Sequence, residues 1–240
     1  MKDTIIVTLV DIKGSAPQVV GAKMKVSPEG LVSGTVGGGK IENHCIEFAK
    51  KMIEGKLDSQ LQTWNLQTDI GMSCGGQVSM FFETQYASNW NIAIFGAGHV
   101  SQELTRVMST WEANVKVYDT RSEWVERLPK SSNIQAVCSE NLASEVKALP
   151  QGTYLVSMTQ GHATDVPVLI EAMKRHEDFE FLGVIGSRIK GDKIRNELRD
   201  AGVDDLAIER LRCPVGLKIG NNTPPEISIS IAAQLLEARG

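Results

Sequence analysis

The stretch from Asn91 to Asp119 places the strongest limit on how this chain can fold. It reads as an apolar run, the turn Gly96-Ala97-Gly98, an amphipathic helical pattern and a second apolar run that ends in Asp119. A strand, a glycine turn, a helix and a strand with a terminal acid form the first half of a dinucleotide-binding unit. The sequence therefore predicts a Rossmann-like sheet in this part of the chain.

The residue types in and around this turn suit a phosphate-bearing ligand. Gly96 allows a tight turn out of the strand, and Gly98 has no Cβ, so a pyrophosphate could approach the backbone. Free amides at the start of the helix would then meet the negative charge. Asp119 has the spacing of an acid that binds ribose hydroxyls, and Arg121 nearby is compatible with NADP as well as NAD. The alternative is a structural unit that holds no nucleotide.

Composition limits the class of protein. Lys and Arg together number 25 against 29 Asp and Glu, and no basic run occurs, which argues against an extended nucleic-acid surface. The four cysteines are widely spaced and show no zinc-ligand pattern, so no metal site is expected. No apolar stretch approaches the length of a membrane span, and the N-terminus does not read as a signal peptide. A cytoplasmic protein with no membrane span is the expectation.

Two domains are predicted. Residues 1–86 are expected to form a smaller β-rich α+β domain, and residues 91–240 the Rossmann-like domain, with a polar segment between them. In the second domain, apolar runs alternate with helical patterns, which predicts a parallel sheet with helices on both faces. Asp165 is expected to cap a helix that follows it, and Thr223 to open a capping box with Glu226 at the last helix.

The first domain carries two further features that could serve a ligand. Gly37, Gly38 and Gly39 lie between a strand and a helix, where successive amides can point into one concavity. Glycines also serve plain turns and close packing, and that alternative stays open. Cys74 precedes Gly75-Gly76 in a loop, where a thiol could be reached and local amides could lower its pKa. The alternative is a small buried residue.

Three polar loops of the second domain should surround one crevice, because ligands bind beyond the carboxyl ends of parallel strands. They are the segments 96–99, 159–162 and 186–188. Arg188, next to Ser187 at a helix start, could clamp a phosphate with its guanidinium. His99 and His162 could contact a ligand, exchange protons or serve only as hydrogen-bonding groups. The chain has no nucleophile elbow, metalloprotease motif or P-loop, so binding is better supported than bond making.

Short motifs follow one another in a specific order along nearly the whole chain. They are Gly14-Ser15-Ala16-Pro17, Gly37-Gly38-Gly39-Lys40-Ile41-Glu42, Cys74-Gly75-Gly76, the Gly96 turn with His99, Asp119-Thr120-Arg121, Gly161-His162-Ala163-Thr164-Asp165, Gly186-Ser187-Arg188, Pro214-Val215-Gly216-Leu217 and Thr223-Pro224. With these motifs the sequence resembles the xanthine dehydrogenase accessory (XdhC/CoxI) family. It departs from the family pattern at Lys218, Pro225 and Ser228.

The resemblance implies a maturation factor for molybdenum hydroxylases that is not itself an enzyme. Such proteins hold the molybdenum cofactor, either molybdopterin or its dinucleotide form, make it available for sulfuration by a cysteine desulfurase and deliver it to the hydroxylase apoenzyme. The residues expected to contact the cofactor are Gly37, Gly38, Gly39, Cys74, Gly96, Gly98, His99, Asp119, Arg121, His162, Ser187 and Arg188. A homodimer is expected, and no residue is assigned a catalytic role.

Two other functions remain open from the sequence. The Gly96 turn and Asp119 would equally serve an NAD(P)-dependent oxidoreductase. A protein-interaction module could also keep the fold without the ligand.

Overall fold

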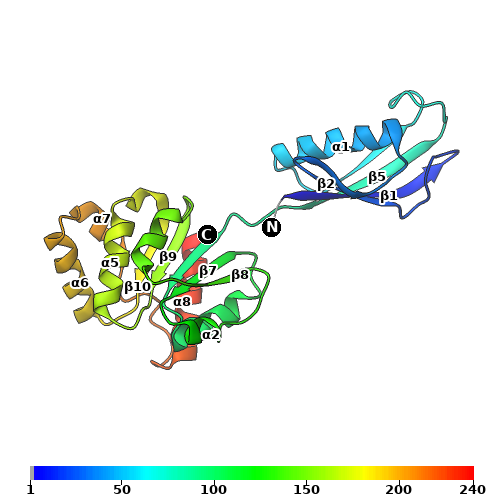
Figure 1. Ribbon diagram of the computed structural model, residues 1–240. Coiled ribbons are helices and arrows are strands. Elements are labelled where there is room, and N and C mark those ends of the chain that lie inside the picture. Colours follow the sequence, from blue (N-terminus) through cyan, green and yellow to red (C-terminus); the bar gives the residue numbers. More distant parts are fainter. Residues whose placement is uncertain (1–2) are drawn as a thin grey trace. The chain divides into compact units, whose positions relative to one another are not determined.

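The structure is a computed structural model that describes residues 3–240. The chain divides into two compact units, Met1–Ala87 and Ser88–Gly240. Figure 1 shows that the first contains one long helix over an antiparallel sheet, and the second contains a sheet with helices on both faces. Within residues 3–240, no helix has both the length and the apolar character needed to cross a membrane.

The N-terminal unit is a five-stranded antiparallel sheet with one covered face. The strand order is β3-β2-β1-β5-β4. Its elements are β1 (Thr4–Lys13), β2 (Lys23–Ser27), β3 (Gly30–Gly34), α1 (Gly39–Glu54), β4 (Gln60–Asn65) and β5 (Gln77–Gln85). Alternate residues of β1, such as Ile5 and Val7, are buried beneath α1, whereas Thr8 on the opposite face is half-buried. This period of two is typical of a sheet packed on one side only.

The C-terminal unit is a six-stranded parallel sheet in the order β11-β10-β9-β6-β7-β8. Its strands are β6 (Asn91–Phe95), β7 (Asn114–Asp119), β8 (Ile134–Cys138), β9 (Thr153–Ser157), β10 (Phe179–Val184) and β11 (Leu211–Arg212). The chain runs outward from β6 to β8, then returns to β9 on the other side of β6. The strand order therefore reverses between β6 and β9, which is where doubly wound sheets bind ligands.

Helices cover both faces of this sheet. They are α2 (His99–Met108), α3 (Ser122–Val125), α4 (Leu142–Glu145), α5 (His162–Met173), α6 (Arg188–Asp200), α7 (Asp205–Glu209) and α8 (Pro224–Arg239), with 3-10 turns at Val146–Ala148 and His176–Asp178. Ile92 and Ile94 of β6 pack with α2 and α8, whereas Ala93 and Phe95 pack with α4 to α7 on the other face. A strand buried on both faces explains the unbroken apolar run in the sequence.

The predicted fold class is confirmed, and local details differ. The predicted cap at Asp165 is wrong: α5 begins one turn earlier, with Gly161 at its N-cap, and the Asp165 carboxylate bonds to neighbouring loops instead. At α8 the Thr223 hydroxyl donates to the Glu226 carboxylate and does not cap a backbone amide. The sequence pattern also missed α7 and β11, which are too short to show a period.

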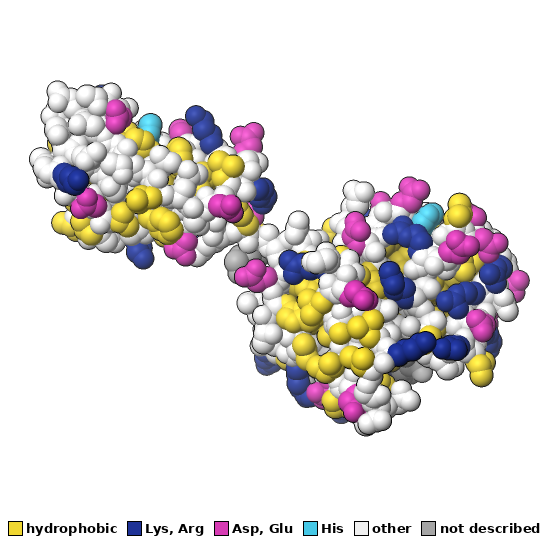
Figure 2. All heavy atoms as spheres, turned by 180° about the vertical axis from the view of Figure 1, so that it is seen from behind, with side chains coloured by type: hydrophobic (Ala, Val, Ile, Leu, Met, Phe, Trp, Pro, Cys, Tyr) yellow, Lys and Arg dark blue, Asp and Glu magenta, His cyan; other side chains and the backbone are white. Residues whose placement is uncertain are grey.

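The surfaces of both units mix charges of both signs, as Figure 2 shows for one face of each. In the same view, hydrophobic side chains gather over one area of the C-terminal unit. Exposed large hydrophobic residues of that unit include Ile189, Leu206, Ile219, Ile229 and Leu236.

Candidate functional site

The loops that follow β6 and β9 touch at the point where the strand order reverses. Gly96 has φ +106°, a conformation that favours glycine. A Cβ on Gly96 would lie 2.3 Å from the carbonyl oxygen of Met158, at the end of β9. Glycine is therefore required here by the fold itself, because any side chain would push the two loops apart. Ser101, at the usual third glycine position, is buried and its hydroxyl donates to the Gly96 carbonyl.

The helices that leave these two loops both begin at a glycine without a side-chain cap. Gly98 precedes α2 and Gly161 precedes α5. A Cβ on either would meet no atom within 4 Å, so both glycines face open space. Neither backbone needs glycine, since Gly98 has φ −66° and Gly161 is fully extended at φ 176°. Uncapped amides at a helix start attract anions, and this edge has two such starts.

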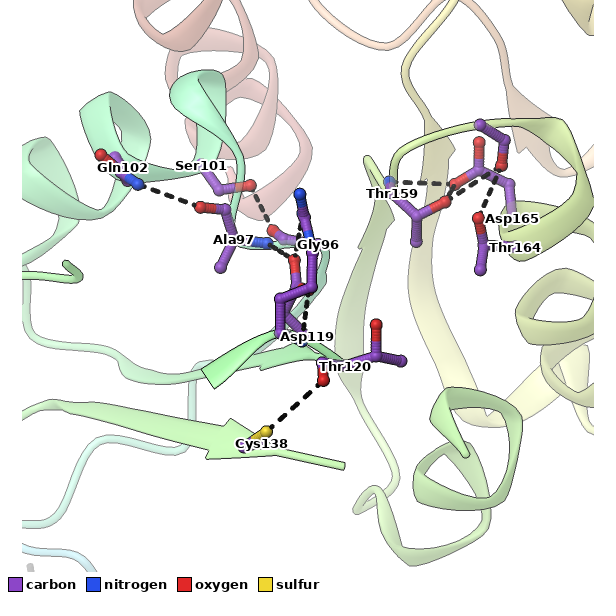
Figure 3. A network of polar contacts seen from close by, with 12 residues as sticks. Gly96, Ala97, Ser101, Gln102, Asp119, Thr120, Cys138, Thr159, Thr164 and Asp165 are labelled. Carbon is purple, nitrogen blue, oxygen red and sulfur yellow. Dashed lines mark hydrogen bonds and ion pairs between the residues drawn. The ribbon is translucent and has the colours of Figure 1, made fainter. Parts of the chain in front are cut away.

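Asp119, at the end of β7, is bound to the glycine turn and to Arg121. Its Oδ2 accepts hydrogen bonds from the amide of Ala97 (2.6 Å) and from Arg121 Nη2 (2.8 Å). Its Oδ1 accepts from the amide of Arg121 (3.0 Å) and from Arg121 Nε (2.9 Å). Figure 3 shows the carboxylate lying against the turn. With 3% of the residue exposed, Asp119 organises the turn and does not present a free carboxylate to a ribose.

Electrostatics favour this closed arrangement. Burial alone would raise the pKa of Asp119, but the hydrogen bonds from Arg121 and Ala97 outweigh it and lower the pKa of the carboxyl. Hydrogen bonding to Asp119 in turn raises the pKa of Arg121. With the Gln160 amide turned so that its oxygen faces the guanidinium, Gln160 accepts from Arg121 Nη1 (2.5 Å) and shares with Asp119 the proton on Nε (2.8 Å). Arg121 thus joins the loops after β7 and β9.

An aromatic cluster borders the same loops. The guanidinium of Arg121 lies 4.8 Å from the centre of the Trp124 ring in α3, and that of Arg127 lies 5.0 Å from it. His99, the first residue of α2, meets Trp124 edge-on with ring centroids 4.9 Å apart. His99 is therefore brought to the predicted edge, where it supports an aromatic side chain.

A second polar network joins the loops after β9 and β10, and the sequence did not reveal it. Asp165 is fully buried, and its Oδ1 accepts from the hydroxyls of Ser157 and Thr159 at 2.7 Å each and from the Thr159 amide at 3.1 Å. Its Oδ2 accepts from Lys190 Nζ at 2.6 Å, and Lys190 also donates to the Ile185 carbonyl. Thr159 and Asp165 appear together in Figure 3. The contact between Asp165 and Lys190 spans 25 residues, so no local pattern could predict it.

Three further residues of this unit that were predicted to contact the ligand, His162, Ser187 and Arg188, differ in their surroundings. The His162 side chain points toward α6, where its Nε2 lies 2.6 Å from Glu197 Oε1. The geometry of this contact does not meet the requirements of a hydrogen bond. Ser187 caps α6 by accepting from the Lys190 amide, which gives it a structural role. Arg188 is exposed in the first turn of α6, and no described residue forms an ion pair with it. The structure thus joins Asp119 to Arg121 and, through the Ala97 amide, to the glycine turn, whereas His162, Ser187 and Arg188 have other partners or none among the described residues.

In the N-terminal unit, three of the sequence motifs meet at one end of the sheet. A Cβ on Gly37 would lie 2.7 Å from Pro17 Cγ, and one on Gly76 would lie 2.1 Å from the Ser15 carbonyl oxygen. Close packing therefore explains Gly37 and Gly76. Gly38 and Gly39 also have positive φ (+66° and +54°), but open space surrounds them at the start of α1. Close packing thus accounts for Gly37, and the ligand alternative stays open for Gly38 and Gly39.

Cys74 lies in the loop that completes this end of the N-terminal unit. It is a free thiol, half-buried and packed against the core cluster. Lys40, after the glycine turn, fixes the same loop by donating to the Gly71 carbonyl at 2.6 Å. Cys45 differs, because burial raises the pKa of its thiol to about 12. Of these two thiols, Cys74 is the more accessible.

Two hollows of the C-terminal unit lie away from the switch point. One of about 510 Å³ is lined by residues between Val125 and Ala136, and one of about 410 Å³ lies beside Phe181 and Arg212. Among residues 3–240, no three His, Cys, Asp or Glu side chains are grouped as a metal site would require. The candidate ligand edge is therefore defined by open backbone amides, not by either hollow.

Comparison with known families decides the identity of this fold. A family model described as the XdhC Rossmann domain matches residues 92–235, and one described as the XdhC and CoxI family matches residues 2–63. The chain belongs to the XdhC/CoxI family. The predicted family is thus confirmed, and the Rossmann-domain model covers the strands and helices that surround the Gly96 turn.

One curated protein is similar to the chain in sequence, and one solved structure is similar to it in fold. The chain is 29% identical over 239 residues to the uncharacterized protein YqeB of Escherichia coli, a match that covers 96% of this chain but only 42% of that protein. It therefore spans about two fifths of this curated relative. A crystal structure described as a xanthine dehydrogenase from Bacillus halodurans has the same fold, with a TM-score of 0.54 and 18% identity over 99% of this chain and 92% of that one.

Proposed function

We propose that this chain binds the molybdenum cofactor as a maturation factor for a molybdenum hydroxylase. The cofactor is a pterin with a phosphate, molybdopterin, or with a dinucleotide tail. The observation that carries the proposal is the pair of uncapped helix starts at Gly98 and Gly161. Both glycines face open space, and their backbone angles do not require glycine. Membership of the XdhC/CoxI family supports the choice of a pterin cofactor over other phosphate esters.

The residues at this edge fit a phosphate group. Amides in the first turns of α2 and α5 would donate to its oxygens, and the positive ends of both helices favour its charge. The ring of His99 lies beside the same loops and is exposed, so a flat pterin could stack on it. Lys190 adds a positive charge near the β10 loop, although Asp165 balances it.

The N-terminal unit carries ligand-binding features of its own, which we assign to the same process. Gly38 and Gly39 offer an open helix start, and Cys74 offers a half-buried thiol in a neighbouring loop of that unit. We assign Cys74 to cofactor retention or sulfur transfer. The partners proposed for the whole cycle are a cysteine desulfurase, a molybdenum hydroxylase apoenzyme and a second copy of this chain.

The test is equilibrium binding of purified molybdenum cofactor under anaerobic conditions, followed by mass spectrometry of small molecules released from the protein. We expect retention at micromolar protein for the wild type. Gly98→Ala should weaken retention at least tenfold, because the added methyl occupies the open space while the backbone and neighbours tolerate it. The control is the urea-unfolding midpoint of the same variant, which should stay unchanged because Gly98 has φ −66° and a Cβ there meets no atom within 4 Å.

Two results would reject this function. One is wild-type protein that releases no pterin and binds none. The other is tight nicotinamide binding with hydride transfer, which would support the NAD(P)-dependent oxidoreductase instead. Recovery of a molybdenum enzyme with pterin-free protein would favour a protein-interaction module.

A further inference from the structure

Arg121 covers Asp119, the acid at the end of β7, which is the position from which dinucleotide-binding folds bind a ribose. A carboxylate offers about four lone-pair positions. In Asp119 all four are occupied: one by the Ala97 amide, one by the Arg121 amide and two by the Arg121 guanidinium. A ribose hydroxyl that donates to Asp119 must therefore first displace a hydrogen bond to a charged group.

The guanidinium is itself held from three sides, so displacement would be costly. Asp119 accepts from Nε and Nη2, the turned Gln160 oxygen accepts from Nη1 and shares the Nε proton, and the Trp124 ring lies 4.8 Å from the centre of the guanidinium. These partners come from β7, the loop after β9 and α3, three separate elements of the unit. The side chain of Arg121 is 23% exposed, and that of Asp119 only 4%. Arg121 therefore lies between the carboxylate and solvent.

We propose that Arg121 excludes ribose-bearing tails from this edge, so that the ligand is a ribose-free phosphate monoester. This inference rests on the proposed function and narrows it: of the two cofactor forms, the site takes molybdopterin and not its dinucleotide. Because Arg121 occupies the Asp119 carboxylate, the ribose of NAD(H) also has no free acceptor there. The Gly96 turn thus keeps the phosphate-binding half of a dinucleotide site and loses the ribose-binding half.

The test uses ADP-ribose as a ribose-bearing probe and isothermal titration calorimetry on the full chain. Wild-type protein should bind ADP-ribose no tighter than millimolar. Arg121→Ala uncovers Asp119 and should bind it at least tenfold tighter, and Arg121→Ala with Asp119→Asn should lose that gain. The matched control is Arg127→Ala, because Arg127 contacts the same Trp124 ring without touching Asp119; it should show no gain.

A second variant covers the case in which Arg121→Ala does not fold. Gln160→Ala removes one support of the guanidinium and leaves the Asp119 pair in place, so it should tighten ADP-ribose binding two- to threefold. Micromolar binding by the wild type that Asp119→Asn abolishes would overturn the proposal. So would a folded Arg121→Ala, or in its absence Gln160→Ala, without any gain. Failure of the wild type to retain pterin would reject the proposed function alone, since the ADP-ribose gain is measured without pterin.

Discussion

The ion pair between the buried Asp165 and the partly exposed Lys190 offers a quantitative test of how the ligand edge is held together. Lys190→Met leaves the Asp165 carboxylate fully buried with three uncharged donors, from Ser157 and Thr159. Asp165→Asn leaves Lys190, whose side chain is 24% exposed and can turn toward water. The two variants should therefore differ, because only one of them strands a charge away from solvent.

The magnitudes follow from this difference in exposure. Breaking a buried pair by removing one partner costs about 3–5 kcal/mol. Lys190→Met should lie at the lower end, about 3 kcal/mol, because three hydrogen bonds to the carboxylate remain. Asp165→Asn should cost about 1–2 kcal/mol, since the ammonium can hydrate. The double variant should cost less than the sum, with a coupling of about 2 kcal/mol.

The assay is urea unfolding of the full chain, followed by tryptophan fluorescence. Trp90, Trp111 and Trp124 report on the C-terminal unit, and a Trp64→Phe background removes the signal of the N-terminal unit. The matched control is Lys193→Met in the same helix. Lys193 is 66% exposed and 4.0 Å from Glu197, so its removal should cost under about 0.5 kcal/mol.

Two outcomes would refute this reasoning. If Lys190→Met costs no more than Lys193→Met, the pair does not contribute to stability. If the costs of Lys190→Met and Asp165→Asn simply add in the double variant, the two charges act independently and the network does not join the β9 and β10 loops.

Three further outcomes are expected. Gly96→Ala should destabilise the C-terminal unit by about 2–4 kcal/mol, since the methyl meets the Met158 carbonyl at a positive φ; a midpoint unchanged in urea would contradict this. The folded-state pKa of Asp119 is lowered, so its contribution to stability is present above the unfolded value of about 3.9 and is lost as the pH falls through the folded value. Asp119→Asn should therefore be less stable than the wild type at pH 7, with the gap closing below about pH 4 in acid titrations of the unfolding free energy; a pH-independent gap would exclude the carboxylate as its cause. Cys74→Ser should weaken cofactor retention or sulfur transfer while the far-ultraviolet circular dichroism stays unchanged, and full retention and transfer by this variant would leave Cys74 a packing role only.

The fold could be predicted because its signals are local. The apolar run of β6, the turn at Gly96 and the acid at the end of β7 lie within 29 residues and follow one known order. Alternation of strands and helices then fixes a parallel sheet covered on both faces. The carboxyl ends of its strands share one edge, which is why Gly96, His99, Asp119 and Arg121 could be placed there from the sequence.

The side-chain partners at that edge could not be predicted, because they depend on distances that the sequence does not contain. Asp165 reads locally as a helix cap, yet tertiary contacts with Ser157 and Lys190 decide its role. Asp119 reads as a ribose ligand, yet the guanidinium two residues later saturates it. In both cases the sequence indicated that an acidic side chain accepts hydrogen bonds at this edge, but it did not indicate the donor. Rotamers and loop contacts select the donor from several possible ones.

The glycines show most directly why a motif alone cannot separate structure from binding. Gly96 and Gly37 are required by close neighbours, so the fold accounts for them with no ligand at all. Gly98 and Gly161 have backbone angles open to other residues and face empty space, so neither close packing nor backbone strain requires glycine there. Glycine is a favoured N-cap residue in its own right, and a ligand that comes close to both helix starts is the explanation that we propose. The case for a bound phosphate therefore depends on Gly98 and Gly161, and a methyl added at Gly98 should impair binding without impairing folding.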